Sequence, residues 1–280
     1  MNYEVRVAAF IAVKMLAGDR CTVWDGITGA DVRAITLQAP TAIDDIVVDL
    51  HRGTPAHAFI SAKDRSGTIP LTSRSSAFAE TVAAFVAQFL KLARETRAEN
   101  RLVWAVPFTV GRAAARELLG VLDTHRLDAG DTSLGKFLRG RRTEERKALH
   151  ALTSLATKAW KRESGNAPAE DEMRQFLRLI HIEVYDFEWG GRHDRLAEED
   201  ISTHISEEPK DAHRIWGKLE HFFSRADQRG FRVTPASLRQ ALNADGFKLK
   251  LPPDYATDIA RLHELTKRNL TRLKEHSMLP

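Results

Sequence analysis

The fold is decided by residues 45–63, whose sequence is DIVVDLHRGTPAHAFISAK. Apolar and polar side chains alternate over residues 45–50 and again over residues 57–63, and a short segment with Gly53 and Pro55 separates the two runs. Alternation with a period of two predicts strands with one apolar face each, and glycine and proline between them predict a turn. The sequence therefore predicts a β-hairpin.

Helical and extended patterns on either side of this hairpin predict an α/β unit. The helical patterns repeat apolar side chains every three or four residues, and the extended ones are short and rich in β-branched or aromatic residues. The expected elements are helices over residues 3–16 and 75–92 and strands over residues 21–24, 32–37 and 102–106. Counting the strand over residues 32–37 and the two hairpin strands, the order around the hairpin is helix, three strands, helix, strand.

Beyond Pro107 helical patterns dominate, with one exception. The alternation of residues 180–187 (IHIEVYDF) predicts a single half-buried strand. The expected helices cover residues 111–125, 144–162, 169–180, 209–229, 234–243 and 255–276. We therefore expect two units, a core over residues 1–108 and a mainly helical domain over residues 109–280 for accessory contacts, oligomerisation or linkage to a further module.

The two strands of the hairpin also bring chemistry-bearing residues together. If both apolar sets enter one core, the natural register places Asp45 opposite Lys63 and Val47 opposite Ser61, with Asp44 just before them. Phosphodiester hydrolysis needs oxygen ligands for Mg²⁺, a metal-activated water and positive charge near the phosphate. In this arrangement Asp45 would hold the metal, and Lys63 would orient or help deprotonate the water.

These residues resemble a known family. Asp44 and Asp45 before an apolar strand, followed by Ser61-Ala62-Lys63, are similar to the Asp … (Glu/Gln)-x-Lys signature of the PD-(D/E)xK nucleases, in particular the Mrr-like group found at the N-termini of bacterial antiviral effector proteins. The resemblance implies a restriction-endonuclease-like mixed sheet flanked by helices. It also implies that Glu4, from the preceding helix, joins Asp44, Asp45 and Ser61 as a metal ligand.

The resemblance further implies an activity and its partners. The expected function is a Mg²⁺- or Mn²⁺-dependent endonuclease acting on double-stranded DNA in anti-phage defence, with Asp45, Ser61, Lys63 and Glu4 in the catalytic site. Effectors of this kind are held idle until a sensor or NTPase module, in cis or in trans, drives their assembly. We therefore expect a homo-oligomer.

One departure from the signature leaves alternatives open. The Glu or Gln of the family is Ser61 in this chain, and a serine hydroxyl is a shorter and weaker metal ligand. Ser61 could bind through water or its backbone carbonyl, Glu4 and Asp49 could replace it, or catalysis has been lost and a silent nuclease-like fold binds nucleic acid or a protein. Asp45 and Lys63 could also form an ordinary exposed cross-strand ion pair.

Composition limits the remaining possibilities. The 280 residues include 42 basic and 38 acidic side chains, a nearly balanced charge that alone does not indicate nucleic-acid binding. The single cysteine, Cys21, and the N-terminal sequence MNYE, which lacks a secretory signal pattern, favour a cytoplasmic protein that does not enter a membrane. Residues 136–142 (KFLRGRR) predict a solvated helix start or a phosphate contact, and residues 233–242 a packed helix or part of a helix-turn-helix.

Overall fold

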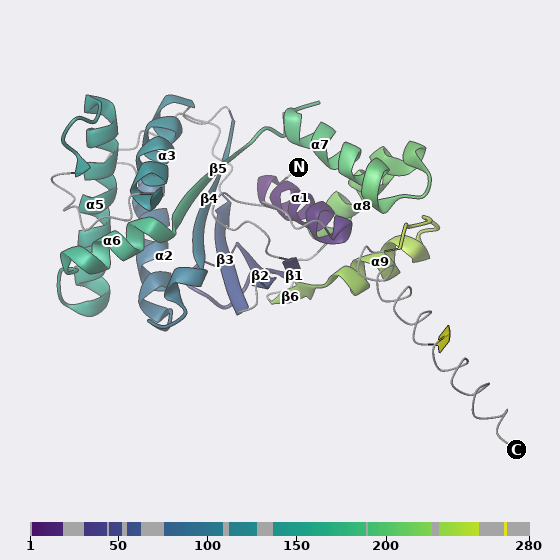
Figure 1. The fold of residues 1–280 in the computed structure, drawn as a ribbon, viewed down its shortest axis with the longest axis horizontal. Helices are drawn as coiled ribbons and strands as arrows, with labels where there is room; N and C mark the ends of the chain where they lie inside the picture. The colour runs from purple at the N-terminus through teal and green to yellow at the C-terminus, as the bar shows by residue number, and fades with distance from the viewer. Residues whose placement is uncertain are drawn as a thin grey trace, which may run out of the picture.

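The computed structural model is built around one six-stranded sheet with helices on both faces (Figure 1). It describes residues 2–18, 31–43, 45–51, 55–62, 76–108, 112–127, 137–188, 190–225, 230–251 and 266–267. The strand order across the sheet is β5-β4-β3-β2-β1-β6. The strands are β1 (Asp31–Leu37), β2 (Ile46–His51), β3 (Pro55–Ala62), β4 (Arg101–Pro107), β5 (Ile180–Tyr185) and β6 (Phe231–Val233).

The sheet is mixed. β1 pairs antiparallel with β2 and with β6, and β2 pairs antiparallel with β3. β3, β4 and β5 are parallel to one another, which requires crossovers that place helices against the sheet. The predicted α/β class with a mixed sheet between helices is confirmed.

The helices form two layers. α1, α7, α8 and α9 cover one face of the sheet, and α2, α3, α5 and α6 cover the other (Figure 1). Their bounds are α1 (Tyr3–Ala17), α2 (Ser76–Lys91), α3 (Arg112–Leu127), α5 (Thr143–Ser164), α6 (Glu170–Leu179), α7 (Arg192–Asp200), α8 (Ala212–Ser224) and α9 (Pro235–Ala244). Short helical turns lie at η1 (Arg97–Glu99), η2 (Ile201–Ile205) and η3 (Pro209–Asp211).

Two hydrophobic cores lie on the two faces of the sheet. Ile46, Val48 and Ile60 are buried against α1, whereas Val47 and Phe59 point into the layer of α2 and α5. Because strands β2 to β4 are covered on both sides, both sets of alternating side chains are buried, as is usual where helices pack on each face. The residues that fill these cores include six that are 2% exposed or less: Ile46, Val48, Ile60, Phe85, Phe89 and Val103.

Helix α1 is central to the first core. The Asn2 side chain accepts a hydrogen bond from the Glu4 backbone N–H at 3.2 Å and starts the helix, and Gly18 ends it in the left-handed conformation (φ 63°). Most of its side chains are buried because the helix lies between the sheet and α7 and α8. A helix that is apolar on nearly all sides is stable only in such a position.

The hairpin has the predicted faces but not the predicted register. Val47 lies opposite Phe59 and Ile46 opposite Ile60, so the expected pairing of Val47 with Ser61 is wrong by two residues. A shift of two leaves every side chain on the same face, so the alternation of the sequence does not distinguish the two registers. The loop sets the register, since His51 pairs with Pro55 and encloses only residues 52–54.

Residues beyond 108 complete the sheet. β5 and β6 are its two edge strands. Residues before and after the predicted domain boundary at residue 108 therefore contribute to the same sheet and to the same two hydrophobic cores. β5 was expected, whereas α7 and the three-residue β6 were not. The strand predicted over residues 21–24 and most of the helix predicted over residues 255–276 lie outside the described residues.

Within the part of the chain that the structure describes, no helix combines the length and the apolar character that a membrane span requires.

Candidate functional site

Asp45 lies at the start of β2 and is held by the backbone of two neighbouring segments. Its Oδ2 accepts a hydrogen bond from the backbone N–H of Ala62 at 2.8 Å, and its carbonyl oxygen accepts one from the N–H of Gln38 at 3.1 Å. The residue is 6% exposed. The carboxylate is therefore fixed at the C-terminal end of β3, beside the residue that precedes Lys63 in the sequence.

Ser61 shares this end of the sheet with Asp45. Ile46 pairs with Ile60, so one further step along the same antiparallel register sets Asp45 across from Ser61. On its other side Ser61 pairs with Trp104 of β4, and it is 3% exposed. The sequence predicted that Asp45 and Ser61 lie close together, and the observed register agrees. The expected pairing of Val47 with Ser61 is replaced by that of Val47 with Phe59.

Glu4 approaches the same end of the sheet from α1, which belongs to the layer of α1, α7, α8 and α9. It lies in the first turn of α1, and its Oε1 accepts a hydrogen bond from the Gln38 side chain at 3.1 Å. Gln38 then donates its backbone N–H to the Asp45 carbonyl, so one residue links Glu4 and Asp45. The α1 layer packs on the sheet face opposite to Val47 and Phe59, so Glu4 approaches the end of the sheet from the opposite side.

No pattern in the sequence predicts that Gln38 connects these residues. Gln38 has φ 49°, the one non-glycine positive φ among the described residues, and it follows the last residue of β1. Glutamine rarely adopts this left-handed conformation, so residue type does not predict the turn. Only the arrangement of β1 beside β2 brings Gln38 to Asp45.

Two of the predicted site residues, Asp44 and Lys63, lie outside the described residues. Their predicted roles, Asp44 as a metal ligand and Lys63 as the group that orients the attacking water, stay predictions. Asp45 is buried, and its cross-strand ion pair with Lys63, which the sequence left open, stays a prediction because Lys63 lies outside the described residues.

Asp49, considered as a replacement ligand, is engaged elsewhere. Its Oδ1 lies 3.1 Å from Nδ1 of His57 and its Oδ2 accepts a hydrogen bond from Arg232 at 2.7 Å. The hydrogen bond with His57, followed by that with Arg232, lowers the pKa of Asp49 below its usual value. Asp49 is four residues from Asp45 along a strand, roughly 13 Å away at the usual rise per residue, so it cannot share a metal ion with Asp45.

The donor atoms near Asp45 suit a magnesium ion with most of its ligands from water or substrate. Asp45 contributes a carboxylate with one oxygen already accepting from Ala62, and Ser61 contributes a hydroxyl. Mg²⁺ commonly takes only one or two carboxylates from protein and keeps several waters. Among the described residues no three His, Cys, Asp or Glu side chains gather closely enough to form a protein-only metal cage.

The other predicted contact regions are ordinary parts of helices where the structure describes them. Arg141 lies over the ring of Phe137, 4.8 Å from its centroid, and the Glu145 side chain accepts from the Arg142 backbone at the start of α5. In α9, Leu238 and Leu242 are buried in the core. These positions favour the solvated helix start and the packed helix over nucleic-acid contacts.

Comparison of the chain with protein-family models and with curated proteins finds no match.

Proposed function

We propose that this chain is a metal-dependent DNA endonuclease domain whose site is centred on Asp45. The observation that carries the proposal is the hydrogen bond from the Ala62 N–H to Asp45 Oδ2. It fixes the Asp45 carboxylate at Ala62, the residue that precedes Lys63 in the sequence, and the register of β2 and β3 sets Ser61 across from Asp45. A carboxylate and a lysine are groups that metal-assisted phosphodiester hydrolysis requires, and the sequence supplies both in Asp45 and Lys63.

Each residue has a distinct task in this proposal. Asp45 would hold Mg²⁺ or Mn²⁺ through its carboxylate, with Ser61 or a water molecule beside it. A metal ion held there would supply a water of lowered pKa and would neutralise charge on the phosphate. Protonated Lys63 would orient that water, and its positive charge would favour the developing negative charge; Lys63 in its neutral form would instead take the proton of the water.

The predicted partners belong to the same proposal. Double-stranded DNA is the substrate, and a sensor or NTPase module in cis or in trans controls the assembly of a homo-oligomer. The biological setting we propose is anti-phage defence in the cytoplasm. These partners are supported by the resemblance of residues 44–63 to the PD-(D/E)xK signature and by the agreement of the α-β-β-β-α-β order with the observed elements α1 to β4.

Plasmid cleavage tests the proposal. Supercoiled DNA is incubated with the protein and Mg²⁺ or Mn²⁺, with a parallel reaction in EDTA. We expect nicked or linear product only with metal, and no product with Asp45→Asn or Lys63→Ala. Lys91→Ala is the matched control, because Lys91 is an exposed lysine at the end of α2 and does not belong to the proposed site.

A catalytically silent fold is the second candidate, and the burial of the site favours it. Asp45 and Ser61 are 6% and 3% exposed, and Asp45 already accepts one hydrogen bond. A buried and hydrogen-bonded carboxylate also serves as a structural cap of β3. Gel-shift binding of DNA without cleavage under any metal, retained by Lys63→Ala, would support this candidate.

A further inference from the structure

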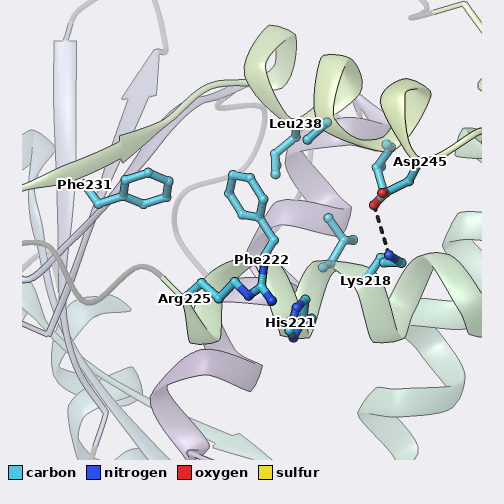
Figure 2. Close-up of a pocket in the computed structure, with 10 residues that line it drawn as sticks. Lys218, His221, Phe222, Arg225, Phe231, Leu238 and Asp245 are labelled. Carbon is cyan, nitrogen blue, oxygen red and sulfur yellow. Dashed lines mark ion pairs between the residues drawn. The ribbon is translucent and has the colours of Figure 1, made fainter.

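A cavity of about 500 Å³ lies between α8, α9 and the edge strand β6, apart from the Asp45 site (Figure 2). α8 forms one wall, α9 faces it, and Phe231 of β6 closes one end. The volume falls within the range of small-molecule sites, which run from about 300 to 1,000 Å³. The space is therefore large enough to admit a compact ligand.

The deeper lining of the cavity is apolar. Leu219, Leu238 and Leu242 line the cavity and are at most 3% exposed. Phe222 and Phe231 also line it, and their ring centroids are 5.6 Å apart. None of these side chains can hydrogen-bond to a ligand. A polar group placed here would lose its hydrogen bonds to water without replacement, so the part of a ligand that enters must be apolar.

The rim carries more positive than negative groups. Lys218, His221 and Arg225 line it from α8, and Asp245 faces them from the end of α9 (Figure 2). Asp245 pairs with Lys218 at 3.3 Å, which neutralises that lysine. Among the described residues no carboxylate pairs with Arg225, so its guanidinium is available to an anion at the mouth of the cavity.

We propose that this cavity binds a small amphipathic anion, with an apolar body between Phe222, Phe231 and Leu238 and a single anionic head at Arg225. His221, one turn before Arg225 on α8, stands beside the head as a further hydrogen-bond donor or acceptor. A carboxylate or sulfonate head satisfies this chemistry. The site is separate from the nuclease proposal, because none of its lining residues belongs to the region around Asp45.

The apolar interior argues against a nucleotide as the occupant. A nucleobase could stack on Phe222 or Phe231, but its polar edge would face Leu219, Leu238 and Leu242. A ligand with an apolar body and a charge at one end would place only apolar atoms against these leucines, so it would lose no hydrogen bond to water there. A fatty-acid-like anion should therefore compete for the cavity better than a nucleotide.

Fluorescence titration of the whole chain tests the proposal with two probes of similar shape. Anilinonaphthalene sulfonate carries one negative charge, and phenylnaphthylamine carries none. We expect saturable binding of both at one site, with the sulfonate bound more tightly. Arg225→Gln should weaken sulfonate binding roughly tenfold, the usual effect of one charge-assisted hydrogen bond, and leave the neutral probe unchanged.

A second variant and a control exclude indirect effects. Ala241→Phe fills the cavity from α9 and should abolish binding of both probes, while thermal melting checks that the variant is folded. Arg162→Gln is the matched control, because Arg162 is an exposed arginine that borders a different cavity of about 390 Å³ beside α2. Equal loss of binding in Arg162→Gln and Arg225→Gln would overturn the assignment.

Displacement of the sulfonate probe identifies the ligand class. Octanoate should displace it. Octanol has the apolar body but no charge, and inorganic phosphate has the charge but no apolar body, so each should require a much higher concentration. Displacement by deoxyadenosine monophosphate at lower concentration than octanoate would contradict the apolar-body assignment. Failure of Arg225→Gln to change the sulfonate affinity would contradict the role of the rim.

Discussion

The carboxylate of Asp45 accepts a hydrogen bond from the backbone N–H of Ala62, 2.8 Å away, across the open end of the β2–β3 hairpin. This bond makes one side chain responsible for two features of the molecule. It satisfies a buried backbone donor at the end of β3, and it fixes the orientation of the carboxylate that the nuclease proposal needs. Substitutions at Asp45 can separate the two roles.

Asp45→Ala should destabilise the protein more than Asp45→Asn. Alanine leaves the buried Ala62 N–H without its acceptor, which costs about 1–3 kcal/mol, whereas the asparagine carbonyl can still accept the bond at a cost of about 1 kcal/mol. Urea unfolding of the two variants measures the difference. Equal loss of stability would show that the hydrogen bond contributes little to folding.

Phe89→Ala should be among the most damaging core substitutions. Phe89 of α2 is fully buried, with its ring 5.2 Å from that of Trp160 and 5.5 Å from that of Phe176. Removal of such a ring costs roughly 3–5 kcal/mol in unfolding free energy. Leu251→Ala, at a position 64% exposed, should change stability by less than about 0.5 kcal/mol and serves as the control.

Arg6→Met should destabilise the protein in a pH-dependent way. Arg6 of α1 donates to Glu220 at 2.8 Å and pairs with Asp194, which joins α1 to α7 and α8. Removing one partner from a largely buried ion cluster costs about 3–5 kcal/mol. Lys147→Met breaks an exposed pair with Glu144 and should cost less than about 1 kcal/mol.

The sign of the pH effect follows from the two carboxyl groups. Burial raises the pKa of Asp194 and of Glu220, although Arg6 opposes the shift. The folded state therefore holds these protons to higher pH than the unfolded state, and stability falls as pH rises from the unfolded pKa through the folded pKa. Without Arg6 both pKa values rise further. The stability lost in Arg6→Met should thus be smaller at about pH 5 than at about pH 7, and a pH-independent loss would contradict this reasoning.

Ser61→Glu should couple stability to metal. The substitution places a second carboxylate beside buried Asp45, and the repulsion between two like charges out of water destabilises the metal-free protein. A bound Mg²⁺ would offset that repulsion, so thermal unfolding in EDTA and in excess Mg²⁺ should differ more for Ser61→Glu than for wild type. The double variant Ser61→Glu, Asp45→Asn should lose the metal response.

Local patterns predicted most of the elements in the described chain. The helix that precedes the hairpin, both hairpin strands and the strand over residues 102–106 were predicted because their apolar periodicities are strong, and the structure confirms them as α1, β2, β3 and β4. The short strand β6 was missed, since three residues carry no periodicity and only pairing with β1 defines them.

The details of the site could not be predicted, because they depend on contacts between segments that are far apart in the sequence. The alternation in β2 and β3 correctly placed Ser61 on the face of Phe59, but a register shifted by two residues satisfies the same pattern. The link from Glu4 through Gln38 to Asp45 joins three separate segments, so it required the tertiary structure.

The most direct test of the central claim is a calorimetric titration of Mn²⁺ in the presence of double-stranded DNA. The Lys63→Ala background prevents cleavage and keeps Asp45, so binding is measured on intact DNA. The nuclease account predicts saturable metal binding by Lys63→Ala and its loss when Asp45→Asn is added. Absence of measurable Mn²⁺ or Mg²⁺ binding by Lys63→Ala and by wild type, with DNA present, would contradict the account and leave the silent fold as the explanation.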